Sequence, residues 1–242
     1  MNRRGSSLVA HDSLRARAGT ADASAEGGGD GGTGRFCASV EAAFCADFDG
    51  VDYLEGWMLQ TAAAASTLED TASFVSPPRS ASISLSLIAG ASTYGRLAHV
   101  LPGAPLEIVV EARLRLTALP DGSGIIPISL RFGSSANDAM RFETGLRLGG
   151  GVLRIFETVH TYPDGGLPQF SGTSFPYGDA GGFDGWTAVR IKLSLDPSNP
   201  GVKGIGTFRV GSGPDRTMNL AMNAAKQPPA APSPVKMSGF TA

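Results

Sequence analysis

The feature that most constrains the fold is a two-residue alternation of apolar and polar side chains. It is clearest in residues 106–116, where every even-numbered position is apolar and every intervening position except Val109 is polar. Successive side chains of a β-strand point to opposite faces, so this period predicts a long antiparallel strand that is buried on one face.

The same alternation recurs along most of the chain after residue 36. Turn signals rich in proline and glycine separate the alternating segments, notably at 101–103, 120–124 and 196–201. The 33 glycines and 16 prolines suit many turns and do not suit a helical bundle. Only 61–70, with its run of alanines, is a helix candidate, and it could equally be a loop. The expected strands are 81–88, 106–116, 126–132 and 189–195, with weaker ones at 142–148, 152–159, 205–210 and 217–222. The sequence therefore predicts an all-β, antiparallel two-sheet jelly-roll sandwich.

The chain divides into two regions. Residues 1–35 have no apolar periodicity, and the glycine-rich stretch 19–34 is typical of a flexible stalk, so we expect a disordered tail. Residues 36–242 are expected to form the jelly-roll domain. Only 235–242 follow the proline-rich segment 227–234, and this short remainder predicts that the domain lacks a well-formed final strand.

Cys37 and Cys45 are the only two cysteines. Their even number and close spacing favour a disulfide, and two buried free thiols are the alternative. Because disulfides persist in oxidising compartments, we expect an extracellular or cell-surface location for the intact gene product. Residues 1–20 contain no apolar run long enough for a signal peptide, so the true start is expected elsewhere; a cytoplasmic location is the alternative. No apolar stretch is long enough for a transmembrane segment.

The segment 160–186 is predicted to be one long loop, because glycine and proline are dense in it. Long loops in compact domains are often functional. Its aromatic rings and acidic groups suit the apolar faces and hydroxyl edges of sugars. The candidate ligand-binding residues are Tyr162, Asp164, Phe170, Tyr177 and Asp179.

Three aspartates, Asp47, Asp49 and Asp52, form a weak candidate Ca²⁺ site because they bring hard oxygen ligands close together. The alternative is that they make local turns with their own backbone. No other cofactor is expected. The net charge of −2 gives no reason to expect a nucleic-acid partner.

Enzyme signatures are sparse. There is no Gly-x-Ser-x-Gly, no His-Glu-x-x-His and no phosphate-binding loop. Glu107 and Glu111 lie on one strand face with arginines, which favours a solvated charged surface. A hydrolase would need carboxylates from separated strands, with Glu107, Glu143, Glu157 and Asp164 as the ones to examine.

Several segments carry a family resemblance. The opening 36–50, Gly56-Trp57, the turn Ser-Pro-Pro-Arg-Ser at 76–80 and the Trp-x-x-Val strand at 185–191 resemble the concanavalin A-like lectin/glucanase superfamily. Within it the chain is similar to laminin-G-like jelly rolls of the bacterial surface-lipoprotein type, over about residues 36–226. The resemblance implies a two-sheet sandwich whose concave face binds carbohydrate or another surface ligand.

Together these features predict a non-catalytic cell-surface or secreted binding module for carbohydrate or a surface polymer. The alternatives are a glycan hydrolase or lyase with carboxylates from separated strands, a structural or adhesive surface protein without a small ligand, and a truncated product without function. The sequence leaves the oligomeric state open.

Overall fold

The structure is a computed structural model of the 242-residue chain. It describes residues 6–18, 37, 42, 44–46, 48, 52–61, 65–74, 79–85, 94–101, 106–116, 124–133, 140–161, 169–179, 183, 185–195, 204–220 and 235–241. Within these residues the regular structure is almost entirely β-strand, and no α-helix occurs.

The strands form two sheets. Sheet A contains β1 (Ser6–Ala18), β2 (Phe44–Ala46), β4 (Ala65–Asp70), β5 (Ser80–Leu85), β7 (Glu107–Leu116), β12 (Thr187–Leu195), β13 (Gly204–Val210) and β14 (Arg216–Asn219). Sheet B contains β3 (Met58–Thr61), β6 (Tyr94–Val100), β8 (Gly124–Gly133), β9 (Met140–Gly149), β10 (Val152–Thr161), β11 (Gln169–Asp179) and β15 (Val235–Thr241).

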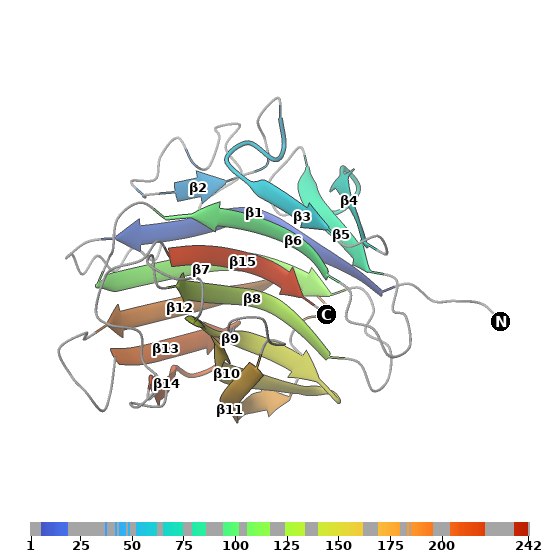
Figure 1. Ribbon diagram of the computed structural model, residues 1–242. Helices are drawn as coiled ribbons and strands as arrows, with labels where there is room; N and C mark the ends of the chain where they lie inside the picture. Colours follow the sequence, from blue (N-terminus) through green and yellow to red (C-terminus); the bar gives the residue numbers. More distant parts are fainter. Residues whose placement is uncertain are drawn as a thin grey trace.

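The two sheets lie face to face, and Figure 1 shows β15 crossing in front of β7. Sheet A has the order β14-β13-β12-β7-β1-β5-β4, with β2 paired to β1, and sheet B has the order β11-β10-β9-β8-β15-β6-β3. The described strand pairs are antiparallel. The predicted all-β, antiparallel two-sheet jelly-roll sandwich is therefore confirmed.

The core lies between the sheets and follows the predicted alternation. Ile108, Val110 and Leu114 of β7 are at most 3% exposed, and Ile191 and Leu193 of β12 are fully buried. Opposite them, sheet B contributes the apolar positions of β8, β9 and β10 to the same cluster. The polar positions of β7 and β12 lie on the outer face of sheet A.

One predicted strand face is interrupted. The alternation in 126–132 places Ile126 beside Ile128, yet Ile125 is in the core and Ile126 is only half-buried. The register between β8 and β9 shifts between Ile125 and Ile128. The shift falls at Pro127, which cannot donate a ladder hydrogen bond and so is tolerated in a central strand only at such an irregularity.

The first strand differs from the expected disordered tail. Residues 6–18 form β1, which lies between β5 and β7 in the centre of sheet A. Its register places Leu8 and Ala10 opposite the core residues Leu116 and Leu114. Pairing with β5 on one edge and β7 on the other thus supplies the order that this segment, which has no clear periodicity of its own, would not have alone.

The last strand also differs from expectation. Val235–Thr241 forms β15 and pairs with β6 on one side and β8 on the other. A segment of seven residues is enough to complete sheet B because both of its edges are hydrogen-bonded.

Two local predictions are wrong. In the helix candidate 61–70, residues 65–70 form β4 paired with β5, so tertiary pairing overrides the helix preference of alanine. The predicted loop 160–186 contains β11, which pairs with the whole of β10. β11 is the edge of sheet B, and Pro176 lies at its register shift, the two places where a strand accommodates proline.

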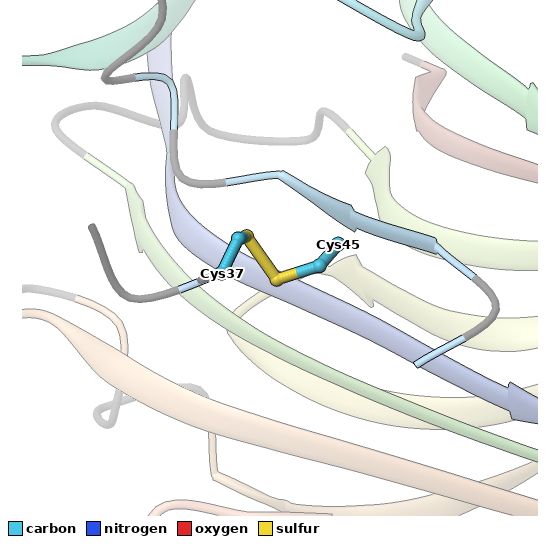
Figure 2. Close-up of a disulfide and its surroundings, with 2 residues drawn as sticks. All are labelled: Cys37 and Cys45. Carbon is cyan, nitrogen blue, oxygen red and sulfur yellow. A yellow bond between two sulfur atoms is a disulfide. The ribbon is translucent and has the colours of Figure 1, made fainter. Parts of the chain in front are cut away.

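The predicted disulfide is present. Figure 2 shows Cys37 joined to Cys45 beside β1, with Cα atoms 5.6 Å apart. Cys45 lies in β2 next to Phe44, whose ring stacks on His99 at 3.6 Å and meets Trp57 edge-on at 4.9 Å. The disulfide therefore ties down a short strand whose aromatic side chain packs into the core.

Candidate functional site

The outer face of sheet B carries an unusual set of polar side chains. Leu130 of β8 and Leu146 of β9 point into the core, so the alternate positions Ser129, Arg131 and Glu143 lie on the opposite, outer face. Strand pairing arranges the outer positions into rows that run across the strands. Three rows concern us: a charged row, a small-residue row and an arginine row.

The charged row contains Arg131 and Glu143, which are direct cross-strand partners. Arg131 Nη2 lies 3.0 Å from Glu143 Oε2, and Ser129 Oγ donates a 2.6 Å hydrogen bond to Glu143 Oε1. Glu143 and Ser129 are each 1% exposed. Burying a carboxylate is costly unless it is paired and hydrogen-bonded, and here both oxygens have a partner.

The small-residue row lies beside the charged row. Gly145 is paired with Ser129 on one side and Phe156 on the other, and the same row continues through β15 to Ala98 of β6. A Cβ at Gly145 would lie 2.2 Å from the carbonyl oxygen of Ile128, so β8 and β9 approach too closely there for any side chain. Apart from Phe156, which is 5% exposed, the row therefore has little side-chain bulk between the charged row and the arginine row.

The arginine row is the next row along. Arg147 of β9 and Arg154 of β10 are direct cross-strand partners. In β6 the arginine row contains Arg96. This residue lies two positions before Ala98 of the small-residue row, on the same side of that row as Arg147. Arg96 lies over the ring of Tyr94, 5.5 Å from its centroid, and Tyr94 is 40% exposed.

Among the side chains that the structure describes, carboxylates from separated strands do not converge on this face. Glu143 pairs with Thr158, whereas Glu157 pairs with Thr144, so the two glutamates point to opposite faces of sheet B. Asp179 occupies an outer-face position level with Val152, about 20 Å along β10 from the partner of Glu143. Among the described residues, Glu143 therefore has no second carboxylate at the separation of about 5–9.5 Å that glycoside hydrolysis uses.

The predicted ligand-binding residues are only partly visible. Tyr162 and Asp164 lie outside the described residues, and Phe170 and Asp179 are placed in β11 by backbone alone. Tyr177 is half-buried, its hydroxyl donating to the carbonyl of Pro214 at 2.8 Å and accepting from the amide of Val210 at 3.0 Å. Tyr177 thus connects the edge of sheet B to the β13–β14 hairpin of sheet A, and its role in ligand binding stays a prediction.

The candidate Ca²⁺ residues are likewise divided. Asp47 and Asp49 lie outside the described residues. Asp52 is exposed, and its Oδ1 accepts a 2.9 Å hydrogen bond from the amide of Leu54, which is the local turn weighed as the alternative. In the part of the chain that the structure describes, no group of three potential metal-ligating His, Cys, Asp or Glu residues occurs.

Glu107 and Glu111 lie on the outer face of sheet A, as a solvated charged surface. Glu111 is 3.5 Å from Arg190, and Glu107 is 3.4 Å from Lys192, with all four side chains at least one-third exposed. They lie on the opposite side of the sandwich from Glu143, so they contribute nothing to a site on sheet B.

Sequence reasoning missed the arginines of sheet B. Arg131, Arg147 and Arg154 all occupy polar positions of predicted strands, and this was the available signal. The sequence alone does not show that these strands are neighbours or which residues face each other across them.

A scan against protein-family models and a search of curated proteins found no match. Among solved structures, the chain is similar to a glycoside hydrolase family 16 endo-glucanase from Bacteroides ovatus, with 12% identity, a TM-score of 0.42 and coverage of 81% of this chain and 84% of that one. It is also similar to an endo-1,3-beta-glucanase from Streptomyces sioyaensis, with 14% identity, a TM-score of 0.36 and coverage of 77% and 84%. These values are too low to carry an argument about activity.

No helix in the described residues is long and apolar enough to cross a membrane.

Proposed function

We propose that the protein recognises a glycan on the outer face of sheet B. The observation that carries this proposal is the buried group of Ser129, Arg131 and Glu143. Ser129 and Glu143 are themselves buried and hold the guanidinium group of Arg131 in place. The Arg131 side chain is 19% exposed, so it is the member of the group that a sugar hydroxyl can reach.

An exposed aromatic ring on the same face supports the proposal. Tyr94 lies at the end of β6 with 40% of its surface accessible. Rings of this kind stack against the apolar faces of sugars while polar neighbours bind the hydroxyl groups. The disulfide between Cys37 and Cys45 supports an extracellular or surface location, where such bonds persist.

Glycan hydrolysis is the second candidate, and Glu143 is the observation that favours it. This carboxylate is buried on the proposed binding face and is held between a hydroxyl and a guanidinium. Hydrolysis by a pair of carboxylates would need a partner for Glu143 from beyond the described part of the chain. A structural or adhesive protein without a small ligand is the reading that a failure to bind would favour.

Thermal unfolding in the presence of glycans tests the proposal. A ligand at 100 times its Kd stabilises the native state by about 2.7 kcal/mol, which for a chain of this size raises Tm by about 5–10 °C. The panel contains neutral and anionic polysaccharides, each assayed also for released reducing ends. If no polysaccharide raises Tm, glycan recognition is refuted.

Matched variants locate the binding face. Tyr94→Ala is expected to weaken glycan binding about 3- to 10-fold without lowering Tm. Phe74→Ala is the control, because Phe74 is similarly exposed, at 37% against 40%, but follows β4 of sheet A. Release of reducing ends that is abolished in Glu143→Gln while binding persists would establish hydrolysis.

A further inference from the structure

Two arginines face each other on the outer face of sheet B. Arg147 and Arg154 are direct partners on β9 and β10, so their Cα atoms are about 4.5–5.5 Å apart. Arg147 is exposed and Arg154 is half-buried. A Cβ at Gly124 would lie 3.4 Å from Nη2 of Arg147, which places this guanidinium over β8.

Among the side chains that the structure describes, no acid forms an ion pair with Arg147 or Arg154. Asp179 of β11 lies one row from Arg154 and is placed by its backbone alone. Like charges directly opposite each other destabilise a sheet, so this pair costs stability in the unliganded protein.

The outer face of sheet A shows the contrasting arrangement. There Arg190 and Lys192 of β12 each meet a glutamate of β7, at 3.5 Å and 3.4 Å. Among the side chains that the structure describes, these two cations of sheet A are therefore paired with acids, whereas Arg147 and Arg154 of sheet B are not. On sheet B, Glu143 lies on the outer face and is already engaged by Arg131 and Ser129.

We propose that the arginine row binds the anionic substituents of an acidic polysaccharide. This inference rests on the proposed glycan recognition and specifies its ligand class. Each guanidinium group carries a fork of N–H donors that matches the oxygens of one carboxylate or sulfate, and cross-strand pairing puts two such groups side by side.

The row extends beyond the pair. Three strand spacings separate Arg147 from Arg96, so the row reaches about 14 Å from β9 to β6. At the β6 end of the row, the guanidinium group of Arg96 lies over the exposed ring of Tyr94, which is a stacking surface. A polymer with repeated charges fits such a spaced set better than a single small anion does.

A polysaccharide is favoured over a nucleic acid by the charge of the whole chain. The net charge is −2, and acidic residues are interspersed with the cations of sheet A, so no broad positive field would attract a phosphate backbone. The cationic excess is local to one row, as expected for a ligand whose charges are spaced along sugar units.

The test measures binding of the full chain to dextran sulfate and to polygalacturonate, with uncharged dextran as the matched neutral polymer. We expect tighter binding to an anionic polymer, with an affinity that falls as salt rises. Arg147→Gln and Arg154→Gln should each weaken that binding about tenfold while leaving Tm unchanged or raised. The control Arg113→Gln removes an exposed arginine from the outer face of sheet A and should change binding less than about twofold. The preferred polymer distinguishes sulfate from carboxylate.

Four results overturn the inference. Equal affinity for dextran and for both anionic polymers would leave glycan recognition standing while refuting the anionic ligand. An equal loss in Arg113→Gln would show non-specific attraction. Tighter binding of a single-stranded oligonucleotide with the same arginine dependence would replace the polysaccharide by a nucleic acid. Binding to no polysaccharide, neutral or anionic, would refute the proposed function itself.

Discussion

Removal of the disulfide is the perturbation whose size follows most directly from the structure. Cys37 and Cys45 are separated by eight residues, and closing a loop of this size lowers the entropy of the unfolded chain by an amount worth about 2.5 kcal/mol. For a domain of 150–250 residues, a loss of this size lowers Tm by about 5–10 °C. We expect the Cys37→Ser/Cys45→Ser double variant to show this decrease and still unfold cooperatively.

The reason for continued folding is that β2 has other contacts. Phe44 stacks on His99 and packs against Trp57, and its ring is 9% exposed. These contacts belong to the core cluster and do not depend on the sulfur atoms.

Calorimetry of the wild type and the double variant, each with and without reductant, is the measurement. Reductant should lower the Tm of the wild type to that of the double variant and leave the variant unaffected. Mass spectrometry must confirm that both wild-type thiols are reduced. An unchanged wild-type Tm after complete reduction would refute the reasoning, since the loop would then contribute nothing to stability.

Three further perturbations follow from contacts at the two sheets. Arg131→Ala leaves the buried carboxylate of Glu143 without its cation and should lower the free energy of unfolding in urea by about 3–5 kcal/mol. A variant that also neutralises Glu143 should recover part of that loss. Tyr177→Phe removes two hydrogen bonds to the β13–β14 hairpin and should cost about 1–2 kcal/mol, whereas an unchanged midpoint would show that the hydroxyl does not join the sheets. The hydrogen bond from Arg209 holds the pKa of Asp215 below its usual value. The ionised carboxylate therefore stabilises the folded state at neutral pH, and this stabilisation is lost as the pH falls below about 4. Asp215→Asn should therefore flatten the acid limb of the Tm against pH curve, and an identical limb would contradict this assignment.

Sequence predictions are accurate where a structural feature depends on the residues of one strand alone, and they fail where it depends on pairing with other strands. The core positions of β7 and β12 were predictable because alternation along one strand needs no knowledge of its neighbours. The prediction from alternation fails at Pro127. Proline has no amide hydrogen to donate, the register shifts there, and Ile125 instead of Ile126 lies in the core. The glycines and prolines of 169–179 predicted a loop because edge-strand pairing, which tolerates them, is not visible in the local sequence.

The sequence by itself determined that the chain is an antiparallel β-protein with a short disulfide loop, because strand periodicity and cysteine spacing are local properties. Only the tertiary structure decided which strands are neighbours and in which register. That register brings Arg147 opposite Arg154 and places Glu143 and Glu157 on opposite faces of sheet B. It also places 6–18 and 235–241 in the centres of the two sheets. Pairing between distant segments depends on the packing of the whole sandwich, so no single segment encodes it.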